Sequence, residues 1–73
     1  MKFDPYRYTI TIRRVTMATK TMFRSTCSEL PDCADYNETP SGAYHLMIDT
    51  IEALHARSIE DGDKFPDPLP VED

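Results

Sequence analysis

Apolar and polar residues alternate with a period of two near the start of the chain. Over residues 6–13 the apolar positions are Tyr6, Tyr8, Ile10 and Ile12. The positions between them are polar or basic, namely Arg7, Thr9, Thr11 and Arg13. Strict alternation of aromatic and β-branched residues with polar ones is typical of a strand that buries one face. The pattern therefore predicts a first strand over about residues 6–14, with its Tyr and Ile side chains facing the core.

Two further strands are predicted downstream. Residues 20–27 are predicted to form a second strand, close enough to the first to pair with it as a hairpin. One face of this strand would carry Thr21, Phe23, Ser25 and Cys27, and the other Met22, Arg24 and Thr26. The connection at residues 15–19 has no Gly, Asn or Pro, so its turn type cannot be assigned. Pro31 fixes its own φ and lacks a backbone donor, so residues 29–32 are expected to interrupt the sheet. A short third strand is expected over residues 33–36, at a sheet edge.

A long amphipathic helix is predicted over about residues 40–60. Thr39 is a good N-cap, Pro40 suits the first helical position, and Gly62 stands where a left-handed C-cap is expected. Gly42 is expected to weaken the first turn by up to ~1 kcal/mol relative to alanine. The residues on the side expected to face the sheet are Ala43, Met47, Thr50, Ile51, Leu54 and Ser58.

The order of these elements predicts one α+β domain over residues 1–73. One helix packed on one face of a three-stranded antiparallel sheet makes two layers and leaves the other sheet face for solvent or a partner. A chain of 73 residues has room for a single core. Residues 64–73 are expected to form an irregular tail, because three of them are prolines, which regular structure excludes.

Charge divides sharply along the chain. The first 26 residues carry six Lys or Arg against one carboxylate, whereas residues 27–73 carry two against twelve. The total is −5 and the sequence pI is about 4.8. An acidic segment repels phosphate and suits a basic protein partner, so the split is informative about partners rather than about the fold.

No catalytic or metal-binding pattern stands out. His45 and His55 project about 80° apart on the predicted helix and cannot share one site. Cys27 and Cys33, even with these histidines, lack the tight spacing of a zinc site, and we expect two separate thiols. Asp61-Gly62-Asp63 lacks the remaining ligands of a calcium loop, and two glycines cannot build a phosphate cradle. We therefore expect no enzyme activity, no metal and no cofactor.

The expected location is the cytoplasm. No apolar run approaches the ~20 residues that a membrane helix needs. The N-terminus has a positive charge at Lys2 but no apolar signal segment after it. We expect no membrane association.

The basic first third leaves a nucleic-acid site open. The residues that would carry it are Arg7, Arg13, Arg14 and Arg24. An acidic pI argues against it, because nucleic-acid-binding domains are normally basic. The competing interpretation is that these arginines lie on the solvated face of a half-buried sheet. This is the interpretation that we favour from sequence.

A second apolar ridge lies beside the core stripe of the predicted helix. Its members are Tyr44, Ile48, His55 and Ile59. Two interpretations remain open from sequence. The ridge is either a helix rim packed by Phe65 and Leu69 from the tail, or an interface for another protein, since exposed apolar patches mark contact sites.

Several short motifs then occur in the order and spacing typical of HicB antitoxins. They are Leu30-Pro31-Asp32-Cys33, the Thr39 cap, Ile51-Glu52-Ala53-Leu54 within the helix, and Glu60-Asp61-Gly62 before the proline-rich tail. Over about residues 20–68 the chain resembles the N-terminal domain of that family. The family's C-terminal DNA-binding module has no counterpart in these residues.

The resemblance implies a partial RNase H-like fold without catalytic activity. It implies an antitoxin-type domain that binds HicA, a small basic toxin ribonuclease, and occludes its active site. On this hypothesis the helix and tail supply the contacts: Tyr44, Ile48, Asp49, Glu52, Ile59, Glu60, Asp61 and Asp63. A homodimer or an adaptor that pairs through an exposed strand edge remains open as an alternative.

Overall fold

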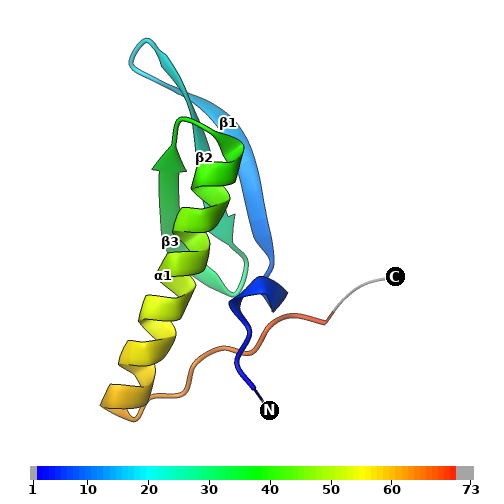
Figure 1. The fold of residues 1–73 in the computed structure, drawn as a ribbon, viewed down its shortest axis with the longest axis vertical. Helices are drawn as coiled ribbons and strands as arrows, with labels where there is room; N and C mark the ends of the chain where they lie inside the picture. The colour runs from blue at the N-terminus through cyan, green and yellow to red at the C-terminus, as the bar shows by residue number, and fades with distance from the viewer. Residues whose placement is uncertain (1, 71–73) are drawn as a thin grey trace.

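Three antiparallel strands and one long helix form two layers in the structure, a computed structural model that describes residues 2–70 (Figure 1). In chain order the elements are the 3-10 helix η1 (Pro5–Arg7), the strands β1 (Ile10–Met17), β2 (Lys20–Cys27) and β3 (Leu30–Asn37), and the helix α1 (Pro40–Asp61). The helix packs on the sheet, so the predicted two-layer α+β fold is confirmed. Residues 71–73 of the predicted tail lie outside the described residues.

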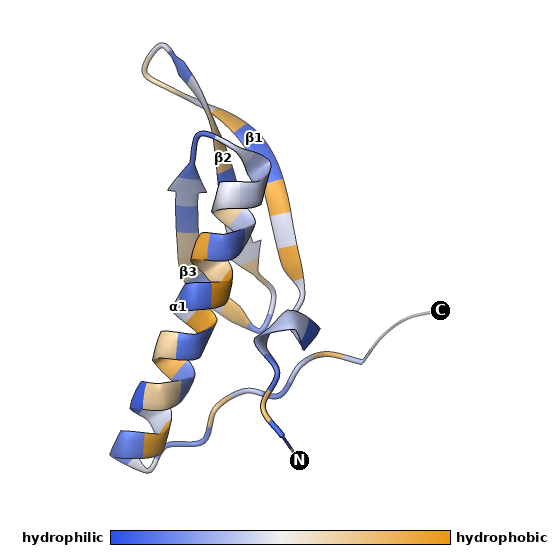
Figure 2. Cartoon of the chain, in the orientation of Figure 1, coloured by the Kyte–Doolittle hydropathy of each residue, from blue (hydrophilic) through white to orange (hydrophobic). Residues whose placement is uncertain are grey.

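The sheet has the order β1-β2-β3, and both β1 and β3 are edge strands. In the β1–β2 register Ile10 lies opposite Cys27 and Ile12 lies opposite Ser25. Ser25 and Cys27 are buried beneath α1, which identifies the helix-covered face of the sheet. Hydrophobic and hydrophilic residues alternate over residues 10–13 of β1, as the predicted period of two requires, but the alternation shifts by one residue at Arg14, so that Val15 and Met17 lie on the other face (Figure 2).

The first strand begins later than predicted, at Ile10 rather than at residue 6. The side chain of Asp4 accepts a hydrogen bond from the Tyr6 N–H at 3.0 Å, and Pro5 opens the turn of η1. Asp followed by Pro favours such a turn, and this local geometry overrides the alternation. As a result Tyr6 is 62% exposed, whereas Tyr8, which lies after the turn, is buried.

The third strand is longer than predicted and includes Pro31. It runs over Leu30–Asn37 instead of residues 33–36. The β2–β3 pairing is nevertheless irregular near the predicted interruption, because Thr26 pairs with Ala34 whereas Cys27 pairs with Leu30, which leaves residues 31–33 in a bulge. Because β3 lies at an edge and pairs only with β2, one side of the strand needs no ladder hydrogen bonds. Sheets accept proline in that position.

A two-residue turn joins β1 to β2. Met17 pairs with Lys20, and Ala18 and Thr19 form the connection. Ala18 has a φ of 57°, in the left-handed region that favours glycine. The hairpin tip extends past the start of α1 (Figure 1).

The predicted helix caps are confirmed. The Thr39 hydroxyl accepts a hydrogen bond from the Gly42 N–H at 2.9 Å, and Pro40 occupies the first helical position. Gly62 ends the helix with a φ of 71°. The Asp63 N–H then donates to the carbonyl of Ser58 at 2.9 Å, which satisfies an acceptor in the last turn.

The core lies between α1 and the helix-covered face of the sheet. Its buried cluster consists of Tyr8, Cys27, Met47 and Ile51. Partly buried residues from both ends of the chain pack around it, namely Phe3, Ile10, Leu30, Cys33 and Phe65. The N-terminal segment and the tail are therefore part of the core boundary.

Candidate functional site

The outer side of α1 carries a run of exposed carboxylates. Asp49, Glu52 and Glu60 recur at helical spacing and are all exposed. Asp61, the last residue of α1, and Asp63, just beyond the helix, extend the run and are also exposed. We call these five residues the acidic helix face. The sequence predicted each of them as a partner contact, and the structure leaves each accessible to a partner.

Only one cation lies among these carboxylates on α1. The Arg57 guanidinium lies 3.7 Å from the Asp61 carboxylate, one helical turn away. Both side chains of this pair are exposed, so the pair contributes little to stability. The remaining carboxylates of the acidic helix face are not neutralised by it, so this side of the molecule presents negative charge.

The predicted apolar contacts divide between core and surface. Ile48 is only 3% exposed and packs inward, so it does not lie on the surface. Tyr44 is half-buried, and its ring stacks with that of Tyr6 at a centroid distance of 6.5 Å. Ile59 is 67% exposed and is the one member of the ridge that stays fully on the surface. Leu46, which the sequence analysis did not select, is also exposed beside Asp49.

The apolar ridge is covered mainly by the N-terminal segment. The His55 ring stacks on Phe3 with a centroid distance of 3.6 Å and an interplanar angle of 3°. Phe65 from the tail contacts His55 edge-on at 5.3 Å. Leu69 is 52% exposed and does not close over the ridge. The helix-rim interpretation thus holds for His55, with Phe3 as a partner that periodicity could not reveal.

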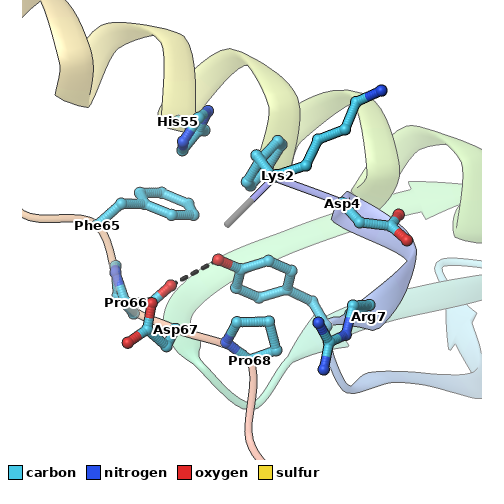
Figure 3. Close-up of a pocket in the computed structure, with 10 residues that line it drawn as sticks. Lys2, Asp4, Arg7, His55, Phe65, Pro66, Asp67 and Pro68 are labelled. Atoms are coloured by element: carbon cyan, nitrogen blue, oxygen red, sulfur yellow. Dashed lines mark hydrogen bonds between the residues drawn. The ribbon is translucent and has the colours of Figure 1, made fainter.

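A cavity of about 300 Å³ lies between the N-terminal segment, α1 and the tail (Figure 3). The Tyr8 hydroxyl donates to the carbonyl of Pro66 at 2.6 Å across its base (Figure 3). Burial, together with the nearby carboxylates of Asp67 and Glu29, raises the pKa of Tyr8, so the hydroxyl remains a donor. The charged lining residues are of both signs: Lys2, Asp4, Arg7 and Asp67.

Glu29, in the turn between β2 and β3, ties the two ends of the chain together. Its carboxylate accepts from the backbone N–H of Thr9 at 3.0 Å, from the Thr9 hydroxyl at 3.1 Å and from the Leu69 N–H at 2.7 Å. Burial alone would raise the pKa of Glu29, but these hydrogen bonds favour the charged form and hold the pKa below its usual value. The sequence contains no signal for this role.

The two cysteines differ in how far they are shielded from solvent. Cys27 is 1% exposed and Cys33 is half-buried, and both are free thiols. Burial raises the pKa of each, and carboxylates near Cys33 raise its pKa further, so neither is an activated thiolate. Within residues 2–70, no group of three or more His, Cys, Asp or Glu side chains is placed to hold a metal ion.

The face of the sheet opposite α1 is uncovered within the described chain. In each strand, every second residue lies on this face. The register groups them into three rows across the strands: Thr11, Thr26 and Ala34; Arg13, Arg24 and Tyr36; and Val15 and Met22. We call these eight residues the open sheet face. It contains a basic pair and an aromatic ring in one row.

The four arginines predicted for nucleic-acid contact are thus separated. Arg13 and Arg24 lie directly opposite each other on the open sheet face. Arg14 pairs with Phe23 and belongs to the other face, and Arg7 lines the cavity. Only two of the four are brought together.

Comparison with protein-family models, with curated proteins and with solved structures finds no match for this chain. What the chain binds must therefore be inferred from its own surfaces. The acidic helix face and the open sheet face differ in charge and lie on opposite layers of the fold. They suit different partners.

Proposed function

We propose that this chain is a non-enzymatic, HicB-like antitoxin-type domain that binds a small basic toxin ribonuclease of the HicA type and occludes it. The observation that carries the proposal is the acidic helix face. Its carboxylates are exposed on an ordered helix, and Arg57 pairs with only one of them. A basic protein is the partner that this charge selects, because complementary potentials steer association and fix orientation.

The motifs behind the HicB resemblance fall on defined elements of the fold. Leu30-Pro31-Asp32-Cys33 forms the first half of β3, and Thr39 caps the helix that carries the carboxylates. Gly62 turns the chain back so that the tail runs towards η1 (Figure 1). Asp61 and Asp63 flank this turn and extend the negative surface beyond the helix.

Occlusion is the mechanism that follows from the charge. A ribonuclease needs cationic side chains to hold the phosphates of its RNA substrate. Carboxylates on a rigid helix can pair with those cations and exclude the substrate, with no chemical step in the antitoxin. Leu46 and Ile59 are exposed beside the carboxylates and supply apolar area for the same contact.

The first test is recovery of the tagged chain from its native host, followed by mass spectrometry of what accompanies it. We expect a small basic protein at near-equal stoichiometry. The recovered protein must cleave RNA when separated and lose that activity when the chain is added back at one equivalent. Recovery of the chain alone, or of a protein whose ribonuclease activity the chain does not inhibit, would overturn the proposal.

The second test assigns the surface. The variant Asp49→Lys/Glu52→Lys should weaken the complex by about tenfold or more and make the affinity less sensitive to salt. The matched control is Asp32→Lys/Glu38→Lys, which changes the net charge equally at exposed carboxylates outside α1. Equal effects of the two variants would mean that total charge matters and that the acidic helix face is not the contact.

A further inference from the structure

One row of the open sheet face joins three residues across all three strands. Arg13 in β1 lies opposite Arg24 in β2, and Arg24 in turn lies opposite Tyr36 in β3. Neighbouring strands lie about 4.8 Å apart, so the row spans roughly 10 Å. Arg13 is exposed. Tyr36 is 41% exposed, although its row crosses the middle of β1 and β2.

The arginine pair is unfavourable for the isolated chain. Like charges directly opposite each other on neighbouring antiparallel strands repel. In addition, the Nε of Arg24 is shielded from solvent and has no hydrogen-bond acceptor within residues 2–70. A buried donor without an acceptor costs free energy. An anion placed between the two guanidinium groups would relieve the repulsion between them.

The negative net charge of the chain does not prevent an anion from binding between these arginines. The carboxylates of the acidic helix face lie on the other layer, beyond the sheet. Lys20, at the hairpin end, is paired with Glu38. Of the two carboxylates in β3, Asp35 accepts a hydrogen bond from Thr50 of α1, and Asp32 lies in the irregular stretch before Ala34, away from the row of Arg13 and Arg24. The row of Arg13 and Arg24 is therefore locally basic.

We infer that the open sheet face binds single-stranded nucleic acid, with Arg13 and Arg24 on the phosphates and Tyr36 stacked on a base. Arginine supplies several donors in a planar fork that matches phosphate oxygens. An exposed aromatic ring on a sheet is a stacking platform for an unpaired base. Neither contact requires the acidic helix face, so the inference is independent of the proposed antitoxin function.

The rows on either side fit this occupant. Thr11 and Thr26 carry hydroxyls, and Ala34 completes that row with a small side chain next to the Tyr36 row. Small side chains leave room for a base beside the ring, and hydroxyls can bond to its edges. On the other side Val15 and Met22 are half-buried and offer an apolar surface. A duplex presents no unpaired base, so the single-stranded form is favoured.

The test is an NMR titration of the full chain with an eight-nucleotide oligouridylate at low salt. We expect backbone amide shifts confined to the open sheet face, with affinity falling as salt rises, by a slope of about −1.4 for two phosphate contacts. No shift, shifts centred on α1, or equal affinity for a duplex of the same length would overturn the inference. Equal shifts from a polyglutamate peptide would also overturn it, because they would indicate acidic proteins as ligands.

The variants separate the site from general charge. Arg13→Gln/Arg24→Gln and Tyr36→Ala should each weaken binding by about tenfold, and Tyr36→Phe should retain it. Arg14→Gln is the matched control for Arg13→Gln alone, because it removes the same single charge from the adjacent position on the opposite face. Arg13→Gln alone keeps the test valid if the double variant does not fold, since Arg13 is exposed. An equal loss in Arg14→Gln would overturn the site.

Discussion

The side-chain amide of Asn37 occupies the space that a Cβ at Gly42 would need. Asn37 ends β3, and its Oδ1 accepts hydrogen bonds from the Thr39 N–H at 3.1 Å and from the Thr39 hydroxyl at 3.3 Å. The same hydroxyl accepts from the Gly42 N–H. Asn37, Thr39 and Gly42 therefore form one connected junction between sheet and helix. A Cβ at Gly42 would displace the Asn37 amide from its hydrogen bonds to Thr39, and this cost acts against the gain in helix propensity expected from alanine.

Gly42→Ala is expected to destabilise the fold by about 1–3 kcal/mol, although alanine is the better helix former by ~1 kcal/mol. The new methyl group must displace the Asn37 amide and break its hydrogen bonds to Thr39. Urea unfolding followed by circular dichroism measures the change in the free energy of unfolding.

The control for this prediction is the same substitution in a chain that lacks the Asn37 side-chain amide. In an Asn37→Ala background, Gly42→Ala should be neutral or stabilising, because helix propensity then acts alone. If the two substitutions are additive, the close approach of Asn37 and Gly42 has no energetic importance.

The helix could be predicted from sequence because its signals are local. Thr39, Pro40 and Gly62 each act within one turn, and the structure places each in its predicted role. The strand limits depended on other contacts. Tyr6 continues the alternation, yet the Asp4 side chain captures its N–H and forms η1. Pro31 lies inside β3 because that strand is at an edge, which a single sequence does not show.

The exposed surfaces could be predicted only in part, because they also depend on strand register and on irregular segments. The carboxylates lie outward because helical period alone places them there. The pairing of Arg13 with Arg24 depends on the β1–β2 register, which the short turn at Ala18 and Thr19 sets. The cover that Phe3 gives to His55 comes from an irregular segment, so no periodic pattern could indicate it.

Ala18→Gly is expected to stabilise the protein by about 0.5–1 kcal/mol. A non-glycine residue at positive φ costs about 1–2 kcal/mol, part of which is offset by the entropy that glycine adds to the unfolded chain. Ala18 is the residue that bears this strain, with a φ of 57°. Thermal unfolding of the variant measures the gain. Thr19→Gly, one residue further in the same turn, should not stabilise, and equal gains would contradict strain at Ala18.

The two thiols are expected to react at very different rates with an aromatic disulfide reagent at pH 8. Cys33 is half-buried and should react in the folded state, whereas Cys27 is 1% exposed and should react only when the fold opens. Burial raises the pKa of both thiols, so both rates should keep rising with pH above the usual thiol range. Low urea should accelerate Cys27 selectively. Equal rates in the absence of urea would contradict the burial of Cys27.

The hydrogen bonds of Glu29 should make the attachment of the tail dependent on pH. Because the pKa of Glu29 is lower in the folded chain than in the unfolded chain, the carboxylate stabilises the fold above the ordinary glutamate pKa of about 4.3. That contribution is lost as the pH falls through the folded-state pKa. The amide resonances of Thr9 and Leu69 should report the titration directly, with a midpoint below 4.3.

Glu29→Gln should lower the free energy of unfolding at pH 7 by about 1 kcal/mol, since hydrogen bonds to a charged acceptor are stronger than those to a neutral one. The difference from the parent chain should shrink as the pH falls through the folded-state pKa of Glu29, because the glutamate then becomes neutral as well. Glu60→Gln on the exposed side of α1 carries the same charge change without these contacts and should show neither effect. A Glu29→Gln deficit that persists below the midpoint reported by the Thr9 and Leu69 amides would mean that packing, and not the carboxylate charge, holds the tail against the N-terminal segment.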